Sequence, residues 1–357
     1  MTILYFILLL SLSLSLSFSQ RSDPVDVAME ELRTVVETAS RNGQRVLVDD
    51  FTGAHYCPYC GYASFAISDM LDEFPGTLIS AQWHLSAYTA EDSALDDCIY
   101  NGIVGDCFEA RADFYGWDSI NAVPIEVFNG AEVIVGASSE ESAYNNYVTV
   151  YDYLVGADTP YEIFINGYND GLNVDYSINV SLDADITTQL NVDPKVHIFV
   201  VEDNIMISWF VWDWLDHNAR NVVRHWIAAG DLTITSSGES QNFSGSFTID
   251  GEAWNPDNVK IIAMVQNDDN AEIFQVQETN VNDLCDDNVW APGNINGGVN
   301  TDQTITVDVF DVLSLADIVV LGDQQSCAYN IGDLNDDGYV NLVDIFVLAS
   351  MILEGSI

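Results

Sequence analysis

The feature that most constrains this chain is a pair of cysteines two residues apart, Cys57-Pro58-Tyr59-Cys60, at the junction of a predicted strand and a predicted helix. The strand covers Arg45–Phe51, and apolar residues recur at helical spacing after Cys60. Free backbone N–H groups and the positive end of a helix dipole stabilise a thiolate at such a junction. We therefore expect Cys57 to attack a substrate and Cys60 to resolve the mixed disulfide.

Two other interpretations of this cysteine pair stay open. Exported proteins commonly carry purely structural disulfides, and Cys57–Cys60 is one candidate. Zinc held by both cysteines and a histidine, His55 or His84, is less favoured because no second pair of ligands has suitable spacing. In the redox interpretation His55, two residues before Cys57, is a candidate for assisting proton transfer.

The first part of the chain resembles thioredoxin-type domains. Strand, helix, strand, helix and a hairpin around Asn129-Gly130 follow one another between residues 24 and about 156. Val123-Pro124 stands just before that hairpin, where thioredoxin-like proteins have a cis-proline. The resemblance implies that Pro124 is cis, faces Cys57 and helps to hold the substrate backbone. The dipeptide between the cysteines is the one seen in glutaredoxins.

From Tyr161 the pattern changes to short alternating runs separated by turn residues, which is typical of an all-β sandwich. The predicted strands are Tyr161–Ile165, Val174–Val180, Val196–Val201, Met206–Val211, Leu232–Ile234, Phe243–Ile249, Lys260–Val265 and Glu272–Gln277. Over roughly residues 45 to 280 the chain also resembles the Omp-twenty-eight-related family of exported thioredoxin-like proteins. The residues that carry this resemblance are Phe51-Thr52-Gly53, Tyr115-Gly116, Val123-Pro124, His217-Asn218, Val222-Val223-Arg224, Ile261–Gln266 and Ile273–Val276. The resemblance implies a β-sandwich after the redox domain. We expect the tryptophans of this region to pack in its core and edges rather than to form a glycan platform.

Residues 333–344 have the spacing of an EF-type calcium loop. The expected Ca²⁺ ligands are Asp333, Asn335, Asp337, the Tyr339 carbonyl, Asn341 and Asp344. Aspartate at the last position, followed by a helix at Ile345–Leu353, resembles a dockerin repeat. Dockerins carry two such repeats and bind cohesin modules, but one is recognisable here. A solvated acidic turn is the alternative. The apolar stripe of the helix needs a partner surface, on this chain or on a cohesin-like or cell-surface partner.

The N-terminus and the charge balance indicate an exported protein that does not bind nucleic acid. Residues 1–19 are uncharged and largely apolar, with Ser17 and Ser19 at signal-peptide cleavage spacing; interrupting serines disfavour a membrane anchor. The chain has 56 acidic and nine basic residues, a net charge of -47, which would repel a phosphate backbone. No later apolar stretch reaches the roughly 18 residues that a membrane span needs. We expect a secreted, periplasmic or cell-surface protein.

The expected fold class is an α/β thioredoxin-like domain, an all-β sandwich domain and a short C-terminal calcium-loop/helix module. The expected boundaries are 1–19 for the signal peptide, 20–156 for the thioredoxin-like domain and 157–282 for the β-sandwich domain. Residues 283–326 are expected to form a linker or extra strands at Thr304–Val309 and Ile318–Leu321, and residues 327–357 the dockerin-type repeat. The expected disulfides are Cys57/Cys60, Cys98/Cys107 and Cys285/Cys327. Two functions remain: exchange with thiol- or disulfide-bearing proteins, or a non-enzymatic surface or matrix role.

Overall fold

The computed structural model describes residues 43–85, 98–100, 103–104, 107–117, 122–186, 193–284, 293–298, 306–321, 331–332, 334 and 340–354. The chain divides into two units, Met1–Asn42 and Gly43–Ile357, and the first lies outside the described residues. The predicted signal peptide and the Cys285/Cys327 pairing therefore lie outside them too. In the described part, no helix has both the length and the apolar character that crossing a membrane requires.

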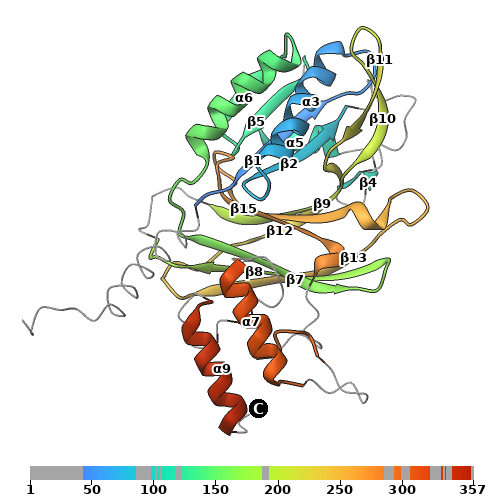
Figure 1. The fold of residues 1–357 in the computed structure, drawn as a ribbon. Coiled ribbons are helices and arrows are strands. Elements are labelled where there is room, and N and C mark those ends of the chain that lie inside the picture. Colours follow the sequence, from blue (N-terminus) through green and yellow to red (C-terminus); the bar gives the residue numbers. More distant parts are fainter. Residues whose placement is uncertain are drawn as a thin grey trace, which may run out of the picture. The chain divides into compact units, whose positions relative to one another are not determined.

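The first half of the described chain forms the predicted strand–helix–strand unit and then a hairpin with a helix (Figure 1). Its elements are β1 (Val46–Thr52), α3 (Pro58–Glu73), β2 (Leu78–His84), β3 (Ile99–Tyr100), β4 (Ile103–Val104), α5 (Cys107–Phe114), β5 (Ile125–Phe128), β6 (Glu132–Val135) and α6 (Glu140–Leu154). Strand β1 pairs with β2 in parallel and with β5 antiparallel. The predicted strand, helix, strand, helix and hairpin occur in this order, and β3, β4 and α6 are additional to the prediction.

The second half is rich in strands, as its alternating pattern predicts. It comprises β7 (Tyr161–Asn169), β8 (Asn173–Leu182), β9 (Pro194–Glu202), β10 (Ile205–Phe210), β11 (Trp214–Ala219), β12 (Val222–Asp231), β13 (Ser240–Thr248), β14 (Val259–Asn267) and β15 (Ile273–Asn280), then α7 (Val309–Leu321) and α9 (Leu342–Glu354). Leu232–Ile234, a predicted strand, is not one. Strands β11 and β12 are additional to the prediction.

One mixed sheet joins the two halves of the chain. Its order is β15-β14-β9-β12-β2-β1-β5-β6, and β12 meets β2 through the single pair Val222 and Gln82. A three-stranded sheet, β13-β8-β7, and the two-stranded hairpin β10–β11 stand beside it. The sandwich that the sequence predicts is thus made by the small sheet and by part of the shared sheet.

The alternation of side chains along the strands creates three hydrophobic layers. On β1, Val46 and Val48 pack with α3 and α6, whereas Leu47 and Phe51 face the opposite side. That opposite side packs against Phe199 and other residues of β9, β12 and β14. The other face of β9 and β14 packs on the small sheet, which lies apart from α3 and α6 (Figure 1). Both cysteines of the predicted site belong to the helix-covered side.

Residues 309–321 correct one expectation. A strand was expected at Ile318–Leu321, but these residues end helix α7. The apolar side chains Val312, Leu315 and Ile318 recur at helical spacing and contribute to one cluster with α9. Short apolar runs fit either structure until a partner surface is known, which is why the sequence alone misassigned this one.

Candidate redox site

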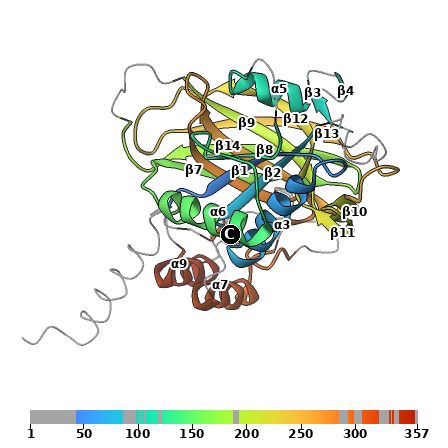
Figure 2. The same ribbon diagram turned by 90° about the horizontal axis from the view of Figure 1, so that it is seen from above.

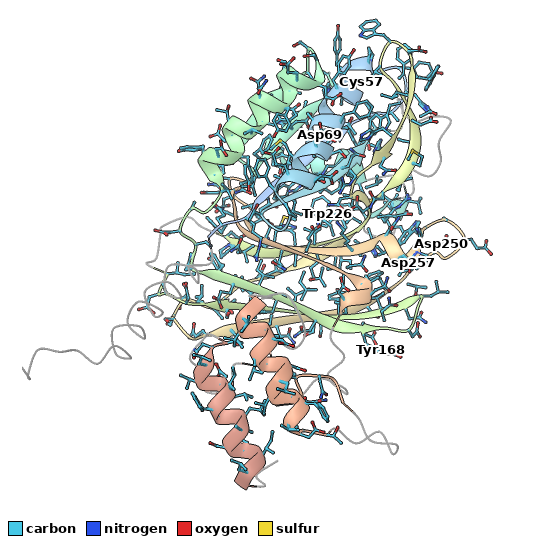
Figure 3. All side chains as sticks on the ribbon, viewed as in Figure 1. Cys57, Asp69, Tyr168, Trp226, Asp250 and Asp257 are labelled. Carbon is cyan, nitrogen blue, oxygen red and sulfur yellow. A yellow bond between two sulfur atoms is a disulfide. The ribbon has the colours of Figure 1, made fainter. Side chains whose placement is uncertain are left out.

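The cysteine pair closes a disulfide at the start of α3, as the junction of strand and helix predicts. Cys57 is the N-cap residue of α3, Pro58 takes the first helical position, and the Cα atoms of Cys57 and Cys60 are 5.3 Å apart. Cys60 is fully buried, while Cys57 keeps 6% of its surface exposed. Figure 3 shows Cys57 at the end of its helix, far from the buried Trp226. A reaction partner would therefore meet Cys57 first.

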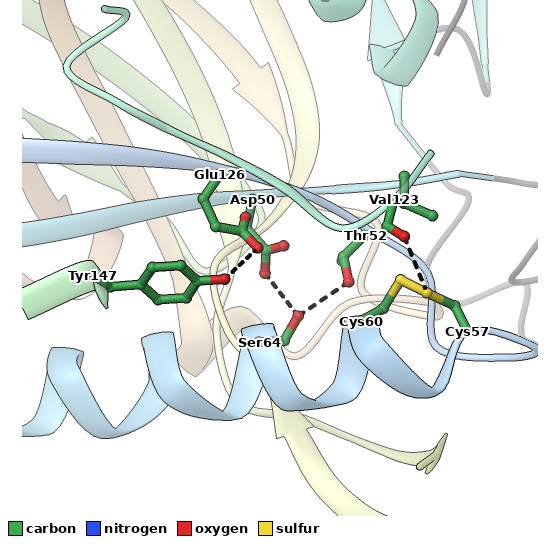
Figure 4. Close-up of a disulfide and its surroundings, with 8 residues drawn as sticks. All are labelled: Asp50, Thr52, Cys57, Cys60, Ser64, Val123, Glu126 and Tyr147. Atoms are coloured by element: carbon green, nitrogen blue, oxygen red, sulfur yellow. Dashed lines mark hydrogen bonds between the residues drawn. A yellow bond between two sulfur atoms is a disulfide. The ribbon is translucent and has the colours of Figure 1, made fainter. Parts of the chain in front are cut away.

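Pro124 holds the position that the thioredoxin resemblance implies. The Val123–Pro124 peptide bond is cis. The sulfur of Cys57 lies 3.6 Å from the carbonyl oxygen of Val123 (Figure 4). The Pro124 carbonyl in turn accepts a hydrogen bond from the N–H of Gly136 at 2.9 Å, which ties this loop to the end of β6. The first cysteine and the proline loop are thus in contact.

A buried carboxyl group lies behind the disulfide, on the strand that leads to it. Asp50 is fully buried, and its Oδ2 accepts hydrogen bonds from Ser64 Oγ and Gln82 Nε2, both at 2.8 Å. The Ser64 and Thr52 hydroxyls are 3.1 Å apart, so hydroxyl groups extend from Asp50 toward the disulfide (Figure 4). Burial raises the pKa of Asp50 to about 6, although these hydrogen bonds lower it.

A second buried carboxyl group stands directly opposite the first. Glu126 on β5 pairs with Asp50 in the strand register, and its Oε1 accepts a hydrogen bond from the Tyr147 hydroxyl at 3.1 Å. Burial and then the Asp50 charge raise the pKa of Glu126 well above its usual range. In the described part of the chain, Asp50 Oδ1 and Glu126 Oε2 have no hydrogen-bond donor. One proton held between the two carboxyl groups would satisfy both oxygens.

Asp49, the neighbour of Asp50, points to the other face of β1 and serves the core. Its carboxylate forms an ion pair with Arg111 at 2.7 Å and accepts a hydrogen bond from Trp83 Nε1 at 2.7 Å. Asp49 and Arg111 are both fully buried. The pair fastens α5 to the sheet, and it offers no group to the disulfide.

Two histidines lie close to the site. Burial, and then the charges of Arg224 and His55, lower the pKa of His84 to about 3, so this ring is neutral. Its Nε2 lies 2.8 Å from Gln82 Oε1, which links it to the Asp50 network. His55 is also buried, and its ring meets Trp214 edge to face, with centroids 5.3 Å apart. A role for His55 in proton transfer stays a prediction.

The second predicted disulfide, Cys98–Cys107, is also formed, and its setting differs. Both cysteines are buried in the cluster that contains Trp83 and Trp226. It closes a loop of nine residues at the start of α5. A structural bridge, the default interpretation of this pair, fits that position. Cys98–Cys107 therefore provides an internal comparison for Cys57–Cys60.

The residues that sequence reasoning missed at this site are Asp50 and Glu126. The available signal was the pair Asp49-Asp50 within β1, a strand whose seven residues are all buried. Carboxyl groups in such a strand cost stability unless they have hydrogen-bond or charge partners, so their presence indicates a candidate functional position. Glu126 carries the same signal within the four buried residues of β5.

The two C-terminal helices begin with the same capping arrangement. In α7, Asp308 accepts a hydrogen bond from the N–H two residues on, at 2.8 Å, and its own N–H donates to the Asp311 carboxylate at 2.6 Å. In α9, Asn341 and Asp344 make the same two bonds, at 2.8 Å each. Asp311 and Asp344 are both fully buried. Each helix therefore starts with a capping box that uses aspartate at its third position.

The sequence before each helix is also repeated. Gly293-Asn294-Ile295-Asn296 precedes α7, and Gly332-Asp333-Leu334-Asn335 precedes α9. Matching apolar positions form a common cluster, including the pairs Ile295 and Leu334, Val307 and Val340, Val312 and Ile345, and Leu315 and Leu348. The chain thus carries two copies of one unit. A longer stretch between loop and helix hides the first copy from a search for calcium-loop spacing.

Most of the predicted calcium ligands lie outside the residues that the structure describes. Asp333, Asn335, Asp337 and Tyr339 lie outside them, whereas Asn341 and Asp344 are described. The described residues contain no cluster of three or more His, Cys, Asp or Glu side chains arranged to hold a metal. Calcium binding by this loop stays a prediction.

No protein-family model and no curated protein matches this sequence. Among solved structures, the chain is similar to HBP35 of Porphyromonas gingivalis, with a TM-score of 0.49 and 15% identity over 68% of this chain and 76% of that one. A domain of the outer membrane lipoprotein Omp28 from the same organism matches at a TM-score of 0.21 and 11% identity, over 34% of this chain and 87% of that one. Beta-glucosidase 3B from Thermotoga neapolitana matches at 0.21 and 12%, over 40% and 20%. These likenesses are distant, so function has to come from the site itself.

Proposed function

We propose that this chain is an exported, thioredoxin-like thiol–disulfide oxidoreductase related to the Omp-twenty-eight-related family, and that it works in a secreted, periplasmic or cell-surface setting. The observation that carries the proposal is the disulfide at the N-terminus of α3, with Cys57, the more exposed of its two cysteines, beside the cis-Pro124 loop and Asp50 buried behind it. A disulfide that served only as a cross-link would need neither the proline loop nor the buried carboxyl group.

In the exchange, a substrate thiolate attacks Cys57 Sγ and the Cys57–Cys60 bond breaks. Its electron pair leaves on Cys60, which takes up a proton. A second substrate thiolate then attacks the mixed disulfide and releases Cys57. Two substrate thiols become one disulfide, and the two electrons stay on Cys57 and Cys60. The reverse sequence reduces a substrate disulfide with the same balance.

Asp50 supplies the proton that Cys60 needs in this scheme. Ser64 follows Cys60 by four residues, one helical turn, so its hydroxyl lies on the same face of α3. Ser64 donates to Asp50, whose pKa of about 6 lets the carboxyl group hold a proton below about pH 6 and release it to a thiolate. We therefore expect the exchange rate to depend on pH near 6.

The reduction potential of Cys57–Cys60 tests the proposal, with Cys98–Cys107 as the control in the same chain. We expect Cys57–Cys60 to equilibrate with glutathione, at a potential of about -200 mV, while Cys98–Cys107 stays oxidised. Iodoacetamide titration of the reduced pair should give one thiol with a pKa well below about 8.5. A Cys57–Cys60 potential below about -300 mV would instead support the structural, non-enzymatic interpretation.

A second function, calcium-dependent docking, is favoured by the repeated C-terminal unit. Dockerin-type modules need two repeats, and the matched caps at Asp311 and Asp344 support counting two here. Matching positions also expose apolar side chains: Leu313 of α7 and Phe346 of α9. We propose that the module binds Ca²⁺ and docks onto a cohesin-like or cell-surface partner. Limited proteolysis of the tail with calcium and with EGTA tests this, and equal cleavage would count against it.

A further inference from the structure

Four exposed aromatic residues gather at the disulfide, and half of them come from the second half of the chain. Tyr56 and Tyr59 belong to the cysteine loop and are 63% and 46% exposed. Trp212 lies in the turn of the β10–β11 hairpin and Trp214 is the first residue of β11; they are 64% and 55% exposed. Large aromatic side chains usually bury much of their surface, so four exposed ones beside a reactive bond need a reason. We call these four residues the aromatic rim.

The hairpin that carries the two tryptophans is fastened to the cysteine helix. The N–H of Phe210 donates to the carbonyl of Ala54 at 2.9 Å, just before the cysteine loop. Val211 packs on Gly61, because a Cβ added at Gly61 would come within 2.3 Å of Val211 Cγ1. Trp209 is fully buried against Phe65 of α3. The hairpin lies beside α3 in both views (Figures 1 and 2).

Ring contacts join the two halves of the rim. The rings of Tyr59 and Trp212 meet edge to face, with centroids 5.9 Å apart, so Trp212 contacts the residue directly before Cys60. Trp214 covers His55, two residues before Cys57, in the same geometry. The rim therefore flanks the loop that carries the two cysteines.

The backbone at the rim is also unusual. Tyr56 has a φ of 61° and Trp212 a φ of 69°, in the left-handed region that bulky residues rarely adopt. Since both side chains are exposed, their own burial does not offset this strain. Residues strained in this way cluster at active sites and ligand-binding sites.

We propose that the aromatic rim binds the polypeptide that exchanges with Cys57–Cys60, and that it selects an extended segment with aromatic and basic side chains next to its cysteine. Aromatic side chains of such a segment can pack on Trp212 and Trp214, and its Arg or Lys side chains can lie over the ring faces. Asp213, exposed between the two tryptophans, and the net charge of -47 favour a basic segment and repel an acidic one. This inference rests on the proposed exchange function and names its substrate class.

The test compares peptide exchange with exchange that needs no docking. The oxidised full-length protein is mixed with dithiol peptides whose cysteines are flanked by Trp and Arg or by Gly and Asp, and separately with dithiothreitol. The variants are Trp212→Gly, which keeps the positive φ accessible, and Trp214→Ala. Met206→Ala is the matched control, because Met206 is 63% exposed at the opposite end of the same hairpin.

We expect each tryptophan variant to slow exchange with the Trp/Arg peptide about tenfold, with the dithiothreitol rate changed less than twofold. The wild-type protein should prefer the Trp/Arg peptide over the Gly/Asp peptide, and Met206→Ala should keep that preference. Unchanged peptide rates in both tryptophan variants would overturn the recognition role. If dithiothreitol fails to reduce Cys57–Cys60 in the wild type, the exchange function itself is wrong.

Discussion

Replacing Asp50 by asparagine should make the protein more stable at neutral pH. Burial raises the pKa of Asp50 from 3.8 to about 6, so the folded protein binds this proton more tightly than the unfolded chain does. Ionisation of Asp50 therefore destabilises the fold: the cost is absent below about pH 4, grows as the pH rises, and is complete above about pH 6. A shift of this size corresponds to about 3 kcal/mol.

The Asp50→Asn variant removes that cost but keeps the shape of the side chain. Ser64 and Gln82 both donate to Asp50 Oδ2, and an amide oxygen can accept both bonds. The new NH₂ group would face Glu126, which can accept a hydrogen bond. We expect the variant to gain about 1–3 kcal/mol in free energy of unfolding at pH 8, and to match the wild type at pH 4.

Urea unfolding of the oxidised protein between pH 4 and pH 8 measures this, and Asp49→Asn is the matched control. Asp49 sits one residue away and is equally buried, but its carboxylate neutralises Arg111. Removing that charge leaves a buried, unpaired guanidinium, so we expect a loss of about 3–5 kcal/mol. If Asp50→Asn gives no gain at pH 8, or the same gain at pH 4, then the burial argument for Asp50 is refuted.

Three further outcomes are expected. Gly61→Ala should lower the free energy of unfolding by about 1–3 kcal/mol, because the new methyl group collides with the β10–β11 hairpin. A change below about 0.5 kcal/mol, the size typical of surface substitutions, would argue against that contact. Replacing Cys98 and Cys107 by serine should cost about 2–3 kcal/mol for a nine-residue loop without changing the rate at which dithiothreitol reduces Cys57–Cys60. Asp311→Ala and Asp344→Ala should expose α7 and α9, respectively, to protease, because each carboxylate accepts a hydrogen bond from the loop before its helix. Protection that neither variant changes would contradict the repeat.

The parts of the site that are close together in the chain were predictable. The Cys57 junction was found because a strand, two cysteines and a helix follow one another within a few residues. Pro124 was placed through the thioredoxin resemblance and is cis as expected. The first C-terminal repeat was missed because a longer stretch separates its loop from its helix and because Asn294 and Gly298 stand where a calcium loop has aspartates. The matching cap at Asp311 and the matching apolar positions reveal the equivalence.

By itself the sequence determined the order of strands and helices, the position of the cysteine pair and the change to an all-β pattern after Tyr161, since each depends on local spacing and turn residues. The tertiary structure decided that β12 joins β2, so that both halves share one sheet. It also set Glu126 opposite Asp50 and brought Trp212 onto Tyr59. These contacts join residues far apart in the chain. They depend on strand register and on the packing of the hairpin against α3, which a local sequence pattern does not specify.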